Sequence, residues 1–301
     1  MVLVAAGLGA SVRRVSGWTQ VGSLTGGWGA AGGQLGQGPP PGRGPSDIAL
    51  TAAGAVFVAD TWNGRVVTWS TPAAPPRLSS FPLGTLPRYL AAVPDTVVAS
   101  DGSTIYDWRD GTWQVVTQLP TAESLVGLGA DQDGWWALVW QVGPDWVAGL
   151  SRWDGHRLVA VGRATWSGPQ GNWTSSAGGQ PGPVRANGTV SWGVPVGGPG
   201  PAPLLGGQPL EGLPPVAAWC PTGIAGLLYV ATTGDRWGVG TAGAGGDGWW
   251  PLPGVPAGVT AVHLSCRQDR AVALLAGDRR WELVWLARAS RWSVRRLGGG
   301  R

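Results

Sequence analysis

Short apolar segments bounded by turn residues recur along this chain at intervals that average about 43 residues. The second apolar segment of each interval is the clearest, and the six read AVFVAD, TVVASD, WWALVW, PVRANG, LLYVAT and RAVALLAG. A unit this short cannot bury an apolar face by itself, so neighbouring units must pack against one another. Four short strands in each unit are typical of a propeller. The sequence therefore predicts an all-β chain that forms a single six-bladed β-propeller of four-stranded antiparallel blades.

The composition is compatible with this fold. Glycine (53 residues) and proline (26) are abundant enough to raise the question of disorder. A hydrophobic content of 43%, with 21 Trp, supplies the apolar surface that offsets chain entropy. Asp-Gly pairs in DWRDGTWQVV, SRWDGHRLVAV and GGDGWWPLPG predict tight hairpins between third and fourth strands.

The period also predicts the boundaries of the units. An N-terminal segment, 1–43, precedes a propeller that spans 44–301. The expected blades cover about 47–86, 87–120, 121–165, 166–212, 213–255 and 256–301, and their inner strands begin near Asp47, Tyr89, Ser124, Asn172, Val216 and Thr260. The closure of the ring is open, because both GWTQVGSLTGG (17–27) and the terminal RWSVRRLGGG can complete the last blade. One of them is then a fifth strand, a loop, or an edge that pairs with another subunit.

The first unit resembles a known repeat. Residues 26–70 read GGWGAAGGQLGQGPPPGRGPSDIALTAAGAVFVADTWNGRVVTWS, which is similar to an NHL repeat. The matching positions are Pro45, Asp47, Ile48, Ala49, Gly54, Val58, Ala59, Asp60, Asn63, Arg65 and Val66. The other units keep the strand plan without the Asn-x-Arg ending. The resemblance implies a six-bladed propeller and transfers no function.

The turns after the second strands carry one acidic or amide residue per unit. They are Asp60, Asp101, Asp145, Asn187, Asp235 and Asp278. A Trp follows closely in four of these turns, as Trp62, Trp146, Trp237 and Trp281. Such turns open on one face of a propeller, so these residues, with Asn63 and Arg65, form a candidate ligand-binding ring. The alternative is structural, because Asp and Asn cap turns through their own backbone.

Catalytic chemistry has little support. His156 and His263 are the only histidines and lie in different units, whereas catalytic zinc sites commonly draw on two or three. We predict no cofactor, and Ca²⁺ held in the channel by Asp and backbone carbonyls is the alternative. Cys220 and Cys266 end the first strands of neighbouring units, so either a disulfide or two reduced core thiols is expected.

The basic residues are concentrated at the C-terminal end. From Cys266 onward nine Arg stand against three acidic residues, within a formal net charge of +4 for the whole chain. Arg288, Arg291, Arg295 and Arg296 are therefore a candidate partner-binding patch, with a solvated edge as the alternative. No basic helix accompanies them, which argues against nucleic acid.

These features favour a non-catalytic scaffold that binds a protein, as in a surface appendage or a virion. A glycan-binding propeller that uses the Trp-lined ring is the first alternative, and a metal-assisted hydrolase or lyase at the channel mouth is the second. No apolar stretch is long enough to span a membrane as a helix. An extracytoplasmic or cell-surface setting is expected, with the cytoplasm as the alternative.

Overall fold

The structure is a computed structural model. It describes residues 10–13, 17–38, 44–93, 96–131, 134–141, 147–167, 172–175, 185–186, 189–190, 204–205, 208–209, 216–221, 226–233, 235–243, 248–267, 269–288 and 293–296. Over these residues the chain forms antiparallel strands and one 3₁₀ turn, Thr61–Asn63, and has no α-helix. Consequently, the described part of the chain contains no helix that is long and apolar enough to cross a membrane.

In the first three sheets, the strands pair in the order in which they occur along the chain. The first contains β3 (Asp47–Leu50), β4 (Val56–Asp60), β5 (Arg65–Trp69) and β6 (Arg77–Ser80) in that order. The second contains β7 (Tyr89–Ala92), β8 (Val97–Ser100), β9 (Thr104–Arg109) and β10 (Thr112–Gln118). The third contains β11 (Glu123–Asp131), β12 (Gly134–Gln141), β13 (Val147–Trp153), β14 (Leu158–Ser167) and β15 (Asn172–Ser175).

Two short ladders and two further sheets complete the order. The ladders pair β16 (Arg185–Ala186) with β17 (Thr189–Val190) and β18 (Leu204–Leu205) with β19 (Gln208–Pro209). One sheet contains β20 (Val216–Pro221), β21 (Gly226–Thr233), β22 (Arg236–Gly243) and β23 (Gly248–Pro251). The last contains β24 (Ala261–Arg267), β25 (Arg270–Ala276), β26 (Arg280–Arg288) and, outermost, β2 (Trp18–Gly27).

The first strands of the sheets lie next to one another. β20 contacts β24, β24 contacts β3, β3 contacts β7, and β7 contacts β11. Hydrogen bonds join neighbouring inner strands: Ser265 Oγ accepts from Leu50 N at 3.0 Å, and Asp47 Oδ2 accepts from Leu90 N at 2.7 Å. Sheets of four antiparallel strands that radiate from adjacent inner strands form a propeller. The expectation of an all-β, NHL-like propeller plan is therefore confirmed.

The core lies between the faces of successive sheets. Because side chains alternate along a strand, β26 packs against a different sheet on each of its two faces. Trp281, Leu283 and Trp285 pack toward the first sheet, while Val284 and Leu286 pack toward the sheet that begins at β20. Trp69 and Trp281 meet at a ring-centroid distance of 5.6 Å. The indole therefore acts as a wedge that fills the widening space between two blades.

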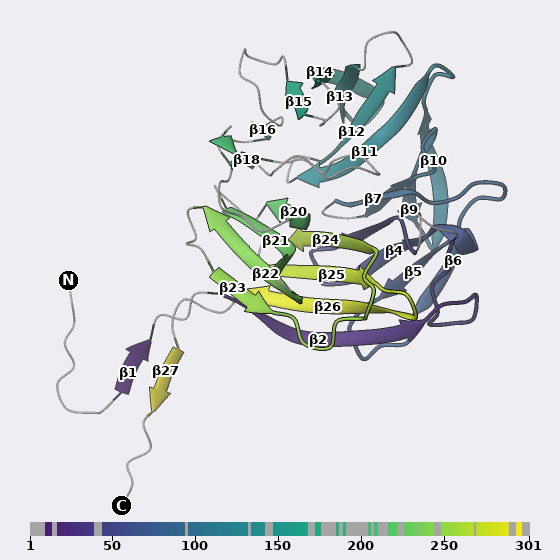
Figure 1. Cartoon of the computed structure of the whole chain (residues 1–301). Helices are drawn as coiled ribbons and strands as arrows, with labels where there is room; N and C mark the ends of the chain where they lie inside the picture. Colours follow the sequence, from purple (N-terminus) through teal and green to yellow (C-terminus); the bar gives the residue numbers. More distant parts are fainter. Residues whose placement is uncertain are drawn as a thin grey trace, which may run out of the picture.

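The last sheet shows which of the two candidate segments completes it. β2 pairs with β26 from Trp18↔Arg288 to Gly27↔Arg280, so the N-terminal strand is the fourth and outer strand. The terminal run pairs elsewhere, because β27 (Ser293–Arg296) forms a two-stranded ladder with β1 (Ala10–Arg13), drawn apart from the sheets in Figure 1. Neither candidate is a fifth strand of this blade.

The expected start of the fourth blade is corrected. Asn172 begins β15, which extends the third sheet through Trp166↔Trp173 and the neighbouring pairs, instead of opening a new inner strand. β14 is ten residues long, and β15 pairs with its outer edge. The described residues that remain for the fourth unit are the ladders β16–β17 and β18–β19.

Candidate functional site

The NHL-like turn after β4 is an internal clamp. Asp60 is fully buried, and its Oδ1 accepts a hydrogen bond from Gly36 N at 2.6 Å. Its Oδ2 accepts from Asn63 Nδ2 at 2.8 Å and from Arg65 Nε at 2.7 Å. Both carboxylate oxygens are thus occupied by groups of the chain itself, and they face no ligand.

The other two members of the turn hold the segment that links β2 to β3. Arg65 donates from Nη1 to Ala30 O at 2.7 Å and from Nη2 to Gln34 O at 2.9 Å. Asn63 Nδ2 also donates to Gly29 O at 2.8 Å. A guanidinium can make these contacts because its planar fork donates hydrogen bonds to several carbonyls at once. Asp60, Asn63 and Arg65 therefore fasten residues 29–36, and their assignment to a ligand ring is corrected.

The remaining ring residues do not gather around one ligand. Asp101 caps its own turn, where Oδ1 accepts from Ser103 N and Thr104 N, each at 2.8 Å. Trp281 is fully buried, and its Nε1 donates to Gly27 O at 3.0 Å, so its role as an exposed aromatic plate is also corrected. Trp237 packs half-buried in the core beside β20–β23.

The other ring members differ in how far they are described. Asp235 and Asp278 are exposed. Trp62 is 46% exposed and lies over Gly36 and Gly38, where an added Cβ would collide with its side chain. Asp145, Trp146 and Asn187 lie outside the described residues.

A second group of titratable side chains lies on the innermost strands and was not predicted as a site. Burial raises the pKa of Asp47 from 3.8 to about 7, although Leu90 N and Ile48 N hydrogen-bond to its carboxylate. Burial also raises the pKa of Tyr89 on β7. On β24, burial lowers the pKa of His263 from 6.5 to about 4 against a hydrogen bond to the Pro45 carbonyl. Asp47 links β3 to β7 through Leu90 N, and the only sequence signal of these three residues was their place in inner-strand segments.

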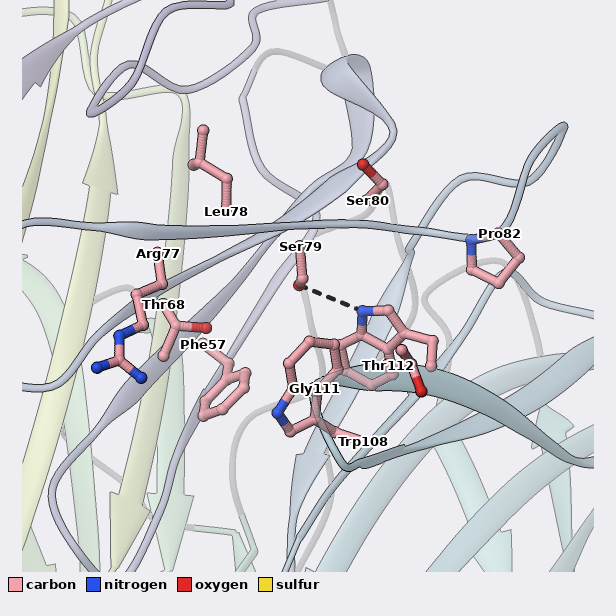
Figure 2. A pocket seen from close by; sticks show the side chains of 11 residues that line it. Phe57, Thr68, Arg77, Leu78, Ser79, Ser80, Pro82, Trp108, Gly111 and Thr112 are labelled. Carbon is pink, nitrogen blue, oxygen red and sulfur yellow. Dashed lines mark hydrogen bonds between the residues drawn. The ribbon is translucent and has the colours of Figure 1, made fainter.

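An open cavity of the described chain is a cleft between the first two sheets. It has a volume of about 730 Å³ and lies between the outer part of β3–β6 and the β9–β10 hairpin. One wall is a row across the first sheet, because Phe57 pairs with Thr68 and Thr68 pairs with Arg77. Figure 2 shows these three side chains on the same side of β6 as Trp108, whereas Leu78 and Ser80 point to the other side.

The opposite wall is aromatic. Trp108 and Trp113 flank the Asp-Gly turn of β9–β10, with ring centroids 5.0 Å apart. Trp113 Nε1 donates to Ser79 Oγ at 3.3 Å, the bond drawn in Figure 2, and its ring lies 5.5 Å from Phe81. No motif in the sequence predicted this cleft. Its available signal was the pair of Trp residues on either side of the predicted hairpin turn.

The remaining candidates are the two cysteines and the C-terminal arginines. A disulfide joins Cys220 of β20 to Cys266 of β24, with a Cα–Cα distance of 5.9 Å, and so links two adjacent inner strands. Arg288 is exposed at the end of β26. Arg291 and the side chains of Arg295 and Arg296 lie outside the described residues. Among the described residues, no three His, Cys, Asp or Glu side chains gather to hold a metal ion.

No protein-family model matches the chain, and no curated protein matches it either. Among solved structures, the chain is similar to the calcium-binding protein regucalcin from Agrobacterium tumefaciens, with 9% identity over 82% of this chain and 92% of that chain, and a TM-score of 0.48. It is similar to virginiamycin B lyase from Staphylococcus aureus, with 8% identity over 84% and 83% of the two chains and a TM-score of 0.40.

A third similarity is to the β-propeller domain of Cps50 (Swd1) from Myceliophteria thermophila, with 11% identity over 81% and 82% of the two chains and a TM-score of 0.39. The similar structures are propeller proteins. The fold of this chain is established by its own sheet order and by the contacts between its inner strands.

Proposed function

We propose that this chain is a six-bladed β-propeller that binds a partner protein and catalyses no reaction. The cleft between the first two sheets is the observation that carries the proposal. Its eleven lining residues supply aromatic rings, hydroxyls and one guanidinium, and they include no carboxylate, imidazole or thiol. Such a lining offers apolar contact, hydrogen bonds and charge, but it offers no general base to activate a nucleophile.

The count of six blades is part of the proposal. Five inner strands contact one another in the spatial order β20, β24, β3, β7 and β11. About one period of the chain separates β15 from β20, and its described residues form the ladders β16–β17 and β18–β19. We assign these two ladders to the remaining blade, which would occupy the place between β11 and β20. An experimental structure with five or seven sheets would contradict this assignment.

An extracytoplasmic setting is also part of the proposal. It is supported by the disulfide between Cys220 and Cys266, because such bonds persist in oxidising compartments. The test is alkylation of the native protein, taken directly from its source without a reductant, followed by mass measurement. We expect neither cysteine to be alkylated. Two alkylated cysteines would place the chain in a reducing compartment.

Affinity enrichment tests the binding function. The folded full chain is immobilised, extract and envelope fractions are passed over it at low and high salt, and retained molecules are identified by mass spectrometry. We expect a protein to be retained, and a protein with the fold disrupted by heat serves as the control. Retention of carbohydrate without protein, or retention of no component above the control, would contradict the proposal.

A further inference from the structure

The outer strand of the first sheet has an unpaired edge. β6 ends the order β3-β4-β5-β6, and in the described part of the chain no strand pairs with its other side. Phe81 N donates to Gly64 O at 3.0 Å, so the residues that bond back toward β5 alternate with those that do not. By this alternation the backbone N–H and C=O groups of Leu78 and Ser80 point outward, away from β5.

This edge runs along the cleft described above. Residues 77–80 line the cleft, together with Trp108 and Trp113 of the next sheet. Leu78, whose side chain points to the side of β6 away from Trp108, is 47% exposed. Exposed strand edges with apolar side chains are templates for pairing with another chain. Backbone hydrogen bonds and side-chain contacts are therefore offered at one place.

The charge of the cleft indicates the chemistry of the segment that binds there. Arg77 is exposed and is the only charged residue among the eleven that line the cleft. A guanidinium beside aromatic rings, with no carboxylate in the lining, is complementary to an acidic group that arrives with the ligand.

From these observations we propose that β6 binds an extended, acidic segment of the partner protein as an added strand. One side chain of the segment would supply a carboxylate to Arg77, and an apolar side chain would enter the cleft between Phe57 and Trp108. This inference rests on the proposed protein-binding function and names the site and the chemistry of the partner segment. Strand addition draws its affinity from main-chain hydrogen bonds and its specificity from pockets for alternate side chains. A sugar could stack on Trp108, but it would not match the regular spacing of the outward N–H and C=O groups of β6 as a strand does.

The experiment uses the full chain and a displayed library of random peptides. Enriched peptides are synthesised, and their binding is measured by fluorescence anisotropy against the wild type, Arg77→Glu, Leu78→Pro and Arg157→Glu. Leu78→Pro removes an outward N–H while leaving the bonds to β5 intact, since proline is tolerated on edge strands. Arg157→Glu is the matched control, because Arg157 is an exposed arginine on the third sheet. Thermal unfolding of each variant verifies that it is folded.

We expect enriched peptides to carry Asp or Glu next to apolar residues. Arg77→Glu should weaken their binding by about tenfold or more, and Leu78→Pro should weaken it by a similar factor. Arg157→Glu should leave the affinity within about twofold of the wild type. The affinity for wild type should also fall as salt is raised.

Three results would overturn the inference in distinguishable ways. If peptides or a retained protein bind equally well to wild type, Arg77→Glu and Leu78→Pro, the partner uses another surface and the binding function stands. If neither the library nor the native extract yields a protein ligand, the proposed function fails as well. Binding of a glycan panel that is lost in Trp108→Ala, with no peptide enriched, would assign the cleft to carbohydrate.

Discussion

Asp60 shows how one residue can suggest two roles. Its place in a repeated turn made it a candidate ligand-binding residue. Its carboxylate is nevertheless fully buried and accepts hydrogen bonds from Gly36, Asn63 and Arg65. A buried carboxylate that is satisfied by a cation and two further donors stabilises the fold through fixed geometry. Removal of one partner leaves the other charge buried without compensation.

We therefore expect Asp60→Ala to lower the free energy of unfolding by roughly 3–5 kcal/mol, because it leaves the guanidinium of Arg65 without its carboxylate. Denaturant unfolding measures the effect. The control is Asp154→Ala, at an exposed hairpin turn where Asp154 Oδ1 accepts from His156 N at 2.8 Å, and it should cost much less. Equal losses for both variants would show that the Asp60 clamp has no special role.

Two side chains on the inner strands predict opposite responses to pH. The pKa of Asp47 is about 7 in the fold against 3.8 when exposed, so its contribution to stability is full below pH 3.8 and is lost as pH rises through 7. The pKa of His263 is about 4 against 6.5, so its contribution is full above pH 6.5 and is lost as pH falls through 4. Between pH 4 and 6.5 the two slopes oppose each other.

The variants Asp47→Asn and His263→Gln separate these slopes. With Asp47→Asn, the free energy of unfolding should rise more steeply with pH between 4 and 6.5 than in the wild type, by up to about 1.4 kcal/mol per pH unit. With His263→Gln it should fall with rising pH over the same window. Urea unfolding at several pH values measures both. Slopes that match the wild type in both variants would show that neither group titrates as stated.

At the scale of elements, β2 closes the last sheet through a close approach of backbone and ring. Gly26 lies against the indole of Trp281, and a Cβ at Gly26 would collide with that ring and with Gly33 O. The next residue, Gly27, has no heavy atom within 4 Å of the place where its Cβ would be. Successive residues of a strand face opposite sides, so this pair separates the two faces of β2.

We expect Gly26→Ala to destabilise the protein by about 1–3 kcal/mol, because the core on that face is already filled. Gly27→Ala should change the free energy of unfolding by less than about 0.5 kcal/mol. Chemical denaturation of the two variants side by side measures the difference. Equal effects would contradict the placement of β2 against β26.

At the scale of the whole molecule, a covalent link joins two sheets that lie far apart in the chain. The disulfide joins inner strands of two adjacent sheets across a sequence separation of 46 residues. A closed loop of this length restricts the unfolded chain and stabilises the folded state by roughly 2–4 kcal/mol.

The double variant Cys220→Ala/Cys266→Ala should therefore unfold at a lower denaturant concentration than the oxidised wild type. A reductant should lower the stability of the wild type and leave the double variant unchanged. Both measurements are made by denaturant unfolding with and without the reductant. A wild type that does not respond to reductant would contradict a stabilising disulfide.

Much of the fold was predictable, because short strands and their turns are encoded locally. The period located the inner strands β3, β7, β20 and β24 within one residue of their observed starts. The fourth unit was misread at Asn172, since pairing of β15 with β14 depends on which edge is free and not on local strand propensity. The candidate ring was drawn from turn residues, and their sequence could not reveal whether the oxygens would meet the chain's own donors or a ligand.

The sequence by itself determined an all-β chain of repeated four-stranded units, because alternation and turn chemistry act over a few residues. Only the tertiary structure decided that β2 and not the C-terminal run closes the last sheet, that Asp60, Asn63 and Arg65 clamp a loop, and that Trp108 and Trp113 border an open cleft. Each of these depends on contacts between residues distant in the chain. Which edge is paired, which carboxylate is satisfied and which indole is covered are properties of neighbouring sheets, and no single segment contains them.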